Sequence, residues 1–96
     1  MNEVSQIIEI VSQQTGISRK RILSAQRMAG VVRARHAIMY VACTQTEKSL
    51  PMIGRALGRD HTTILHGYRK VKSRLRDDED LAVLVAETIM ILESRI

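Results

Sequence analysis

Apolar residues recur along most of the chain at the three- and four-residue spacing of one helix face, and no stretch shows the alternation of a strand. Gly16 stands where a left-handed cap would end a first helix, and Ser18 stands where a hydroxyl would cap a short second helix over residues 19–25. The apolar face of the first helix consists of Val4, Ile7, Ile8 and Val11. The pattern therefore predicts helices from the start of the chain.

The longest uninterrupted helical stretch is VVRARHAIMYVACTQT, residues 31–46. It follows a segment without periodicity, in which Gly30 indicates a loop. Arg33 and His36 lie away from the apolar stripe, with Arg35 beside them, so we expect the helix to begin with a basic face. The stripe itself consists of Val31, Ala34, Ile38, Val41 and Ala42.

A short helix, a turn and a longer helix come next. Ser49 and Pro51 are typical of a helix start, because Ser caps exposed backbone amides and Pro is tolerated in a first turn. The helix predicted from them covers residues 50–57. Gly58 then supplies a turn with positive φ, and Asp60 is placed to accept hydrogen bonds from the amides that open the following helix.

This order of elements is that of a helix-turn-helix, which we place at about residues 49–76. In this motif the second helix enters the major groove of DNA and its first residues meet base edges. On a helical wheel, the residues that face inward are Ile64, Tyr68, Val71 and Leu75. The outward residues are Thr62, Thr63, His66, Arg69, Lys70 and Ser73, with Asp60 and His61 at the tip.

A last helix is predicted at about residues 79–95, after the acidic run DDED, because negative charge is favoured at a helix N-terminus. Together these elements predict an all-α fold of about six helices in a single domain spanning residues 1–96. The last helix is apolar over more than half of its circumference, so it is also a candidate surface for a homodimer or a protein partner. We expect Met28, Met39, Met52 and Met90 to fill the core.

Charge changes the picture, because it is concentrated in the middle of the chain. Residues 17–76 hold 14 basic and 2 acidic residues, a charge of +12. The rest of the chain holds one basic residue, Arg95, and 8 acidic residues, a charge of −7. A sequence pI of about 10 favours a polyanionic partner, and nucleic acid is the first candidate. The chain has only 2% aromatic residues, which argues against stacking on single strands.

The string SLPMIGRALGRDHTTILHGYRKVKSRL closely resembles the signature of the C-terminal DNA-binding domain of the bacterial replication initiator DnaA. The resemblance extends over RILSAQR and VVRARHAIMYVA and leaves only the extreme ends unmatched. It implies a compact bundle similar to the Trp repressor, and binding to a short duplex box. We therefore expect a free-standing protein that binds a DnaA-box-like site in replication initiation, in its regulation, or as a transcriptional regulator.

The resemblance also assigns site residues. It implies base contacts in the major groove by Asp60, His61, Thr62 and Thr63, and in the minor groove by Arg27. The basic helix start and the outward face of the recognition helix supply the expected phosphate contacts. These are Arg33, Arg35, His36, Ser49, Arg59, His66, Arg69, Lys70 and Lys72, and the same basic run continues with Arg74 and Arg76.

The chain departs from the family pattern at several positions. His36 replaces a common Gln, and Cys43 replaces a Lys. Gly58 alone precedes Arg59 where two glycines are frequent, and a turn one residue shorter would change which bases the helix meets. The sequence has no Walker A loop and no ATPase module, so full initiator activity does not follow from the resemblance.

Other readings of the same residues are weaker. Asp60 and Thr63 could form a helix cap alone, although a carboxylate can cap and contact a base at once. His61 and His66 point in different directions on the helix, so we expect no metal site. Nothing indicates an enzyme, a cofactor, a bound nucleotide or a membrane segment, and the single Cys43 suits the cytoplasm. The alternative to DNA binding is an interaction module that uses the apolar terminal helix.

Overall fold

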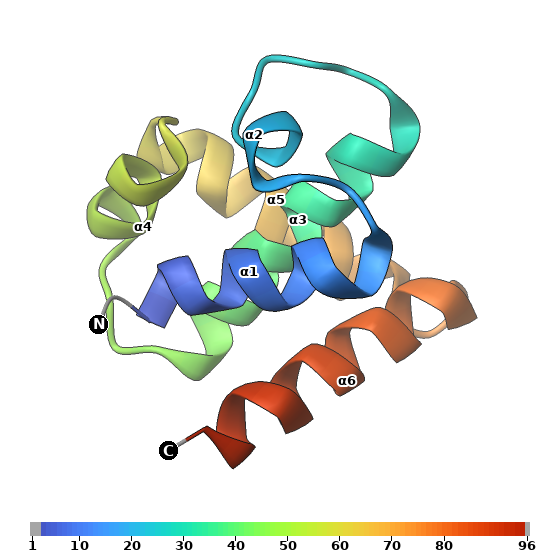
Figure 1. Ribbon diagram of the computed structural model, residues 1–96. Helices are drawn as coiled ribbons and strands as arrows, with labels where there is room; N and C mark the ends of the chain where they lie inside the picture. Colours follow the sequence, from blue (N-terminus) through green and yellow to red (C-terminus); the bar gives the residue numbers. More distant parts are fainter. Residues whose placement is uncertain (1–2, 96) are drawn as a thin grey trace.

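The computed structural model describes residues 3–95, which form six α-helices and no strand (Figure 1). The all-α prediction is confirmed. The helices are α1 (Glu3–Thr15), α2 (Arg19–Ile22), α3 (Ala29–Gln45), α4 (Leu50–Leu57), α5 (His61–Arg74) and α6 (Glu79–Ser94). The pair α4 and α5 forms the helix-turn-helix.

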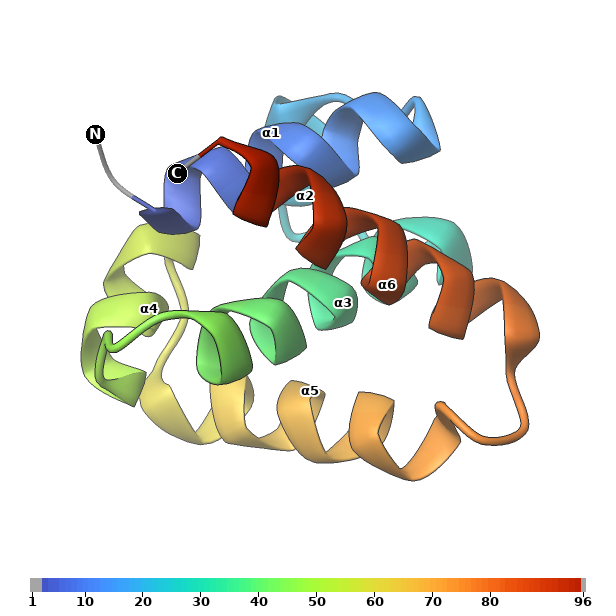
Figure 2. The same ribbon diagram turned by 90° about the horizontal axis from the view of Figure 1, so that it is seen from below.

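Helix α3 runs through the middle of the molecule. Figure 2 shows it between α5 on one side and α1 with α6 on the other, and it also contacts α2 and α4. Its predicted apolar stripe is buried at every position. The neighbouring helices cover it with buried aliphatic residues, among them Ile8 and Val11 of α1, Ile64 and Val71 of α5, and Val85 of α6. The core therefore forms around α3, and the apolar faces of the other helices turn towards it.

The caps lie at the predicted residues. The hydroxyl of Ser18 accepts a hydrogen bond from the amide of Arg21 at 3.2 Å, and that of Ser49 accepts one from the amide of Met52 at 3.3 Å. Gly58 adopts the left-handed conformation with φ of 68°, which ends α4 and turns the chain towards α5. These local interactions set the starts of α2 and α4 and the end of α4 where the sequence predicts them.

Three predictions about the fold are wrong. Helix α2 ends at Ile22, because the hydroxyl of Ser24 donates to the carbonyl of Arg21 and the chain turns away there. Gly30 lies inside α3, which begins at Ala29. Of the four methionines expected to fill the core, only one does so, because aliphatic side chains occupy the core. Met39 is buried, whereas Met28, Met52 and Met90 are 61%, 42% and 70% exposed.

Two glycines allow helices and turns to approach closely. A Cβ atom on Gly54 of α4 would overlap the carbonyl oxygen of Arg59, in the turn that leads to α5. A Cβ atom on Gly67 of α5 would overlap the sulfur of Met39 in α3. The first obstacle is backbone, whereas the second is the side chain of Met39, with Cδ2 of His36 next at 3.1 Å, so the two positions should differ in tolerance.

Replacement of Gly54 by Ala is expected to lower the free energy of unfolding by about 1–3 kcal/mol, the usual range for overpacking. The higher helix propensity of Ala, about 1 kcal/mol, offsets only part of this loss. Urea denaturation followed by circular dichroism measures the change. Gly67→Ala is the matched control and should cost less, because the buried but flexible side chain of Met39 can adjust more easily than the backbone of Arg59. Equal losses in the two variants would contradict this account of Gly54.

Candidate nucleic-acid interface

The start of α5 presents a compact group of exposed polar side chains. One carboxylate oxygen of Asp60 accepts hydrogen bonds from the amide of Thr63, at 2.9 Å, and from the hydroxyl of Thr62. The hydroxyl of Thr62, and then the amide of Thr63, lower the pKa of Asp60 to about 2. Asp60 is therefore ionised at neutral pH, and its carboxylate has lone pairs for further donors. His61 lies beside it with its side chain exposed.

The rest of α5 has the predicted inward and outward faces. Ile64 and Val71 are buried, while His66, Arg69 and Ser73 are exposed. Lys70 and Lys72 flank this exposed face on opposite sides. Lys70 lines a groove next to α3, whereas the ammonium of Lys72 lies 5.8 Å from the ring centroid of Tyr68. That ring stacks on Tyr40 of α3 at 5.5 Å between centroids. The exposed face of α5 is thus basic along both edges.

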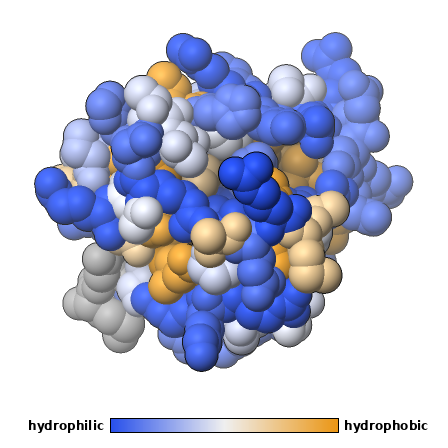
Figure 3. All heavy atoms as spheres, turned by 90° about the horizontal axis from the view of Figure 1, so that it is seen from above, coloured by the Kyte–Doolittle hydropathy of each residue, from blue (hydrophilic) through white to orange (hydrophobic). Residues whose placement is uncertain are grey.

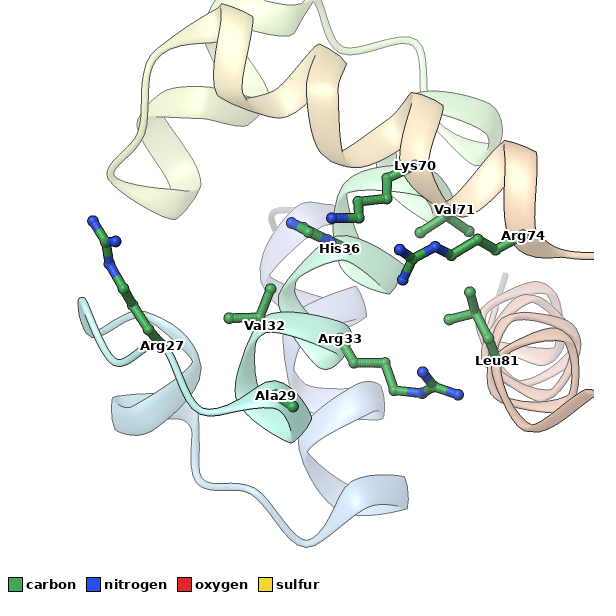
Figure 4. Close-up of a pocket in the computed structure, with 9 residues that line it drawn as sticks. All are labelled: Arg27, Ala29, Val32, Arg33, His36, Lys70, Val71, Arg74 and Leu81. Atoms are coloured by element: carbon green, nitrogen blue, oxygen red, sulfur yellow. The ribbon is translucent and has the colours of Figure 1, made fainter. Parts of the chain in front are cut away.

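The groove next to Lys70 has a volume of about 250 Å³ and lies among α3, α5 and α6 (Figure 4). Its polar wall is almost entirely basic, and its apolar floor includes Val32, Val71 and Leu81. The basic residues that line it are Arg27, Arg33, His36, Lys70 and Arg74. Figure 4 shows Arg27 extending from the loop before α3, apart from the side chains of α5. This groove brings together segments that are far apart in the sequence.

Arg33 is half-exposed in this groove and is already paired. Its Nη2 lies 2.6 Å from Oδ1 of Asp78, and the two side chains are 40% and 24% exposed. Asp78 is also the N-cap of α6, where it accepts a hydrogen bond from the amide of Leu81 at 3.1 Å. An anion that binds Arg33 here would compete with a pair that contributes up to about 1 kcal/mol.

His36 lies half-buried between α3 and α5. Its ring is 6.3 Å from that of His66, edge to face. Burial lowers the pKa of His36 to about 4, and the nearby positive charge of Lys70 is the next cause. Smaller contributions come from His66, Arg35 and Arg74. His36 is consequently neutral at pH 7 and can offer a phosphate a hydrogen bond rather than a charge.

Arg35 does not lie where the sequence analysis expected it. Its side chain is only 6% exposed, and it donates to the carbonyls of Ile22, Ser24 and Gln26 at 2.9, 2.9 and 3.2 Å. The loop before α3 folds back over the helix and turns these carbonyls towards the guanidinium group. Arg35 of α3 therefore holds the loop in place. Its burial contradicts the prediction that it binds a phosphate.

Arg59 is also engaged within the protein. Its guanidinium group donates to the carbonyl of Leu57 at 2.8 Å and to that of Ser24 at 2.6 Å. The residue types give no signal of this partnership, because the acceptors are backbone carbonyls, which every residue carries. Arg74, one of the expected phosphate contacts, is exposed and shares the groove with Lys70.

The surface around α2 and the loop before α3, at the top of Figure 1, is mainly hydrophilic with small apolar patches (Figure 3).

Within residues 3–95, no cluster of three potential metal ligands occurs. Over the same range, no helix is both long enough and apolar enough to cross a bilayer. The candidate interface is a basic, polar surface built from α3, α5 and the loop that precedes α3.

A helical bundle with a helix-turn-helix, a capped polar tip and basic flanks defines the class of helix-turn-helix DNA-binding domains. The family described as "Bacterial dnaA protein helix-turn-helix" matches residues 4–71. The chain belongs to this DnaA family.

Its relatives are chromosomal replication initiator proteins DnaA. That of Rhodopseudomonas palustris (strain TIE-1) is 46% identical over 81 residues, and that of Nitrobacter hamburgensis is 44% identical over the same length. In both comparisons the match covers 83% of this chain and 17% of the relative. The chain thus spans about a sixth of the length of these curated relatives.

Folding is expected to weaken as the pH falls from about 6.5 towards 4, because His36 has a lowered pKa in the folded state. In that window the unfolded chain takes up a proton that the folded chain resists, so stability present above pH 6.5 is lost. Thermal denaturation at a series of pH values measures this effect. His36→Gln keeps a polar side chain without a titratable group and should lose less stability over the window. Identical pH profiles for the two proteins would rule out His36 as the cause.

Proposed function

We propose that the chain recognises a DnaA-box-like site in duplex DNA. The observation that carries the proposal is the Asp60 to Thr63 tip, exposed at the start of α5 and flanked by basic side chains. A major groove about 12 Å wide admits an α-helix, and these residue types match base edges. Asp accepts from the cytosine amino group, His donates or accepts, and the Thr methyl packs on the thymine methyl.

The remaining contacts follow from the positions of the basic and polar side chains. Arg27, exposed in the loop before α3, enters the adjacent minor groove. Ser49 uses its hydroxyl hydrogen for a phosphate, because its oxygen lone pair already caps α4. The other phosphate ligands that we propose are Arg33, His36, His66, Arg69, Lys70, Arg74 and Lys72.

The biological setting that we propose is replication initiation or its regulation, with transcriptional regulation as a further use of the same binding. The relatives named above are replication initiators, and this chain matches the part of them that contains the helix-turn-helix. Occupation of initiator sites would be sufficient for a regulatory role. Such a protein would act in the cytoplasm, at the nucleoid.

The second candidate function is binding of a protein partner or a second copy through α6. The observation in its favour is that Val83 and Met90 of α6 are 48% and 70% exposed. In this alternative the basic surface only steers the encounter. It predicts weak, equal and steeply salt-dependent binding to any duplex, which the following measurement detects.

Fluorescence anisotropy with a labelled duplex that carries an initiator box, against a scrambled duplex, tests site recognition. At about 150 mM salt we expect a preference of roughly a hundredfold or more for the box, within the range of specific DNA-binding proteins. Equal affinity for both duplexes would reject recognition of this box. Selection from random duplexes would then show whether the shortened turn has changed the preferred site.

Base contacts and phosphate contacts should respond differently to substitution. His61→Ala is expected to cost about 1–3 kcal/mol on the box and little on the scrambled duplex. Arg69→Ala should weaken binding to both duplexes and reduce the salt dependence by roughly one unit of slope. Titrations over a range of salt concentrations measure both effects. Arg95→Ala, at the end of α6, is the control that should change neither. If His61→Ala and Arg69→Ala behave alike, the tip does not read bases.

A further inference from the structure

One backbone carbonyl joins two parts of the candidate interface. The carbonyl oxygen of Ser24 accepts a hydrogen bond from Arg59, at 2.6 Å, and another from Arg35, at 2.9 Å. Ser24 lies in the loop that carries Arg27, Arg35 lies in α3, and Arg59 lies in the turn just before α5. The loop and the helix-turn-helix, 35 residues apart in sequence, are thereby connected through one side chain.

Arg59 can fix the position of the loop relative to the turn, because hydrogen bonds hold both its backbone and its side chain. Its amide donates to the carbonyl of Gly54 at 2.8 Å, and its Nη1 donates to the carbonyl of Leu57 at 2.8 Å. The lack of a side chain on Gly54 lets the carbonyl of Arg59 approach α4 closely. The guanidinium group therefore has a fixed place relative to the turn, and its Nη2 is directed at the loop.

The loop around Arg27 depends on such polar attachments. The residues from Ala25 to Met28 are exposed, so they contribute nothing to the apolar core. Beside the hydrogen bonds of Ser24, arginine side chains attach the loop: Arg35 donates to the carbonyls of Ser24 and Gln26, and Arg21 donates to the side chain of Gln26 at 3.2 Å. A change at Arg59 therefore removes one of a small number of connections that position the loop.

The arrangement brings two positive charges together, which is unfavourable by itself. Burial and then repulsion by Arg59 lower the pKa of Arg35. The ion pair found among residues 3–95 joins Arg33 and Asp78, so it does not neutralise either of these two arginines. Directed hydrogen bonds to carbonyls compensate for the repulsion, and they require the forked geometry of guanidinium groups.

From this geometry we infer that Arg59 is a positioning residue, which sets the loop of Arg27 in register with the recognition helix α5. Its role is to make minor-groove and major-groove contacts possible at the same time, rather than to bind a phosphate. The inference deepens the proposed function and rests on it. The two roles place different demands on the side chain. A phosphate can be bound by the positive charge of either Lys or Arg, whereas two carbonyls on different segments need the forked donors of an arginine.

A double-mutant cycle on the initiator-box duplex tests this assignment. Arg27→Ala is expected to weaken binding about tenfold in the wild-type background and less than about twofold in Arg59→Lys, because the loop is no longer held in register. His61→Ala should cost the same in both backgrounds, since it lies on α5 itself. Arg59→Lys alone should weaken binding to the box with an unchanged salt slope. Arg55→Lys, an exposed arginine on α4, is the matched control and should behave as the wild type.

Three outcomes of the cycle would overturn the inference. Wild-type affinity in Arg59→Lys would mean that charge alone is sufficient. An equal cost of Arg27→Ala in both backgrounds would mean that the loop does not depend on Arg59. A similar reduction in the costs of Arg27→Ala and His61→Ala would indicate a general loss of structure.

Amide hydrogen exchange of the protein without DNA separates failure of this inference from failure of the proposed function. The amide of Ser24 donates to the carbonyl of Arg21 at 3.1 Å, and the amide of Gln26 donates to the hydroxyl of Ser24 at 3.2 Å. In Arg59→Lys these two amides should exchange severalfold faster, while amides of α5 stay unchanged. If the wild type shows no preference for the box, this measurement alone decides the positional role. Unchanged exchange at Ser24 and Gln26 would overturn it.

Discussion

The burial of α3 on nearly all sides is the constraint on which the other elements depend. Because its apolar stripe must be covered, α5 packs against one side and α1 with α6 against the other. At Gly67 of α5 the side chains of Met39 and His36 in α3 pack directly against the backbone of α5. Burial of these aliphatic residues supplies most of the driving force of a domain this small. The same packing leaves the start of α5 exposed at the edge of the bundle.

A second set of interactions, polar rather than apolar, positions the parts of the interface that the core does not reach. Arginine side chains donate to backbone carbonyls of the loop before α3 and of the turn before α5. Such bonds are directional, so they can hold a loop in place without burying it. The loop of Arg27 and the tip at Asp60 thus belong to one framework, even though neither is part of the core.

Charge is separated along the fold as it is along the sequence. Arg33 of α3 and Lys70 and Arg74 of α5 face a common groove, and Asp78 at the start of α6 pairs with Arg33. Burial, and then the positive charge of nearby basic groups, lowers the pKa of His36 and keeps it neutral. A polyanion would meet a surface whose positive potential is focused by a partly apolar groove.

The sequence by itself determined the helices, their caps and the polar tip, because those features depend on neighbours within four residues along the chain. Gly58 and Asp60 set the turn and the start of α5 through local backbone conformation and capping. The site depends on contacts that local patterns do not contain. On the helix wheel Arg35 is simply a basic residue near Arg33, whereas the folded loop buries it under three carbonyls. Only the tertiary structure decided which arginines are free for a ligand, because their acceptors are backbone atoms brought close by the packing of distant segments around α3.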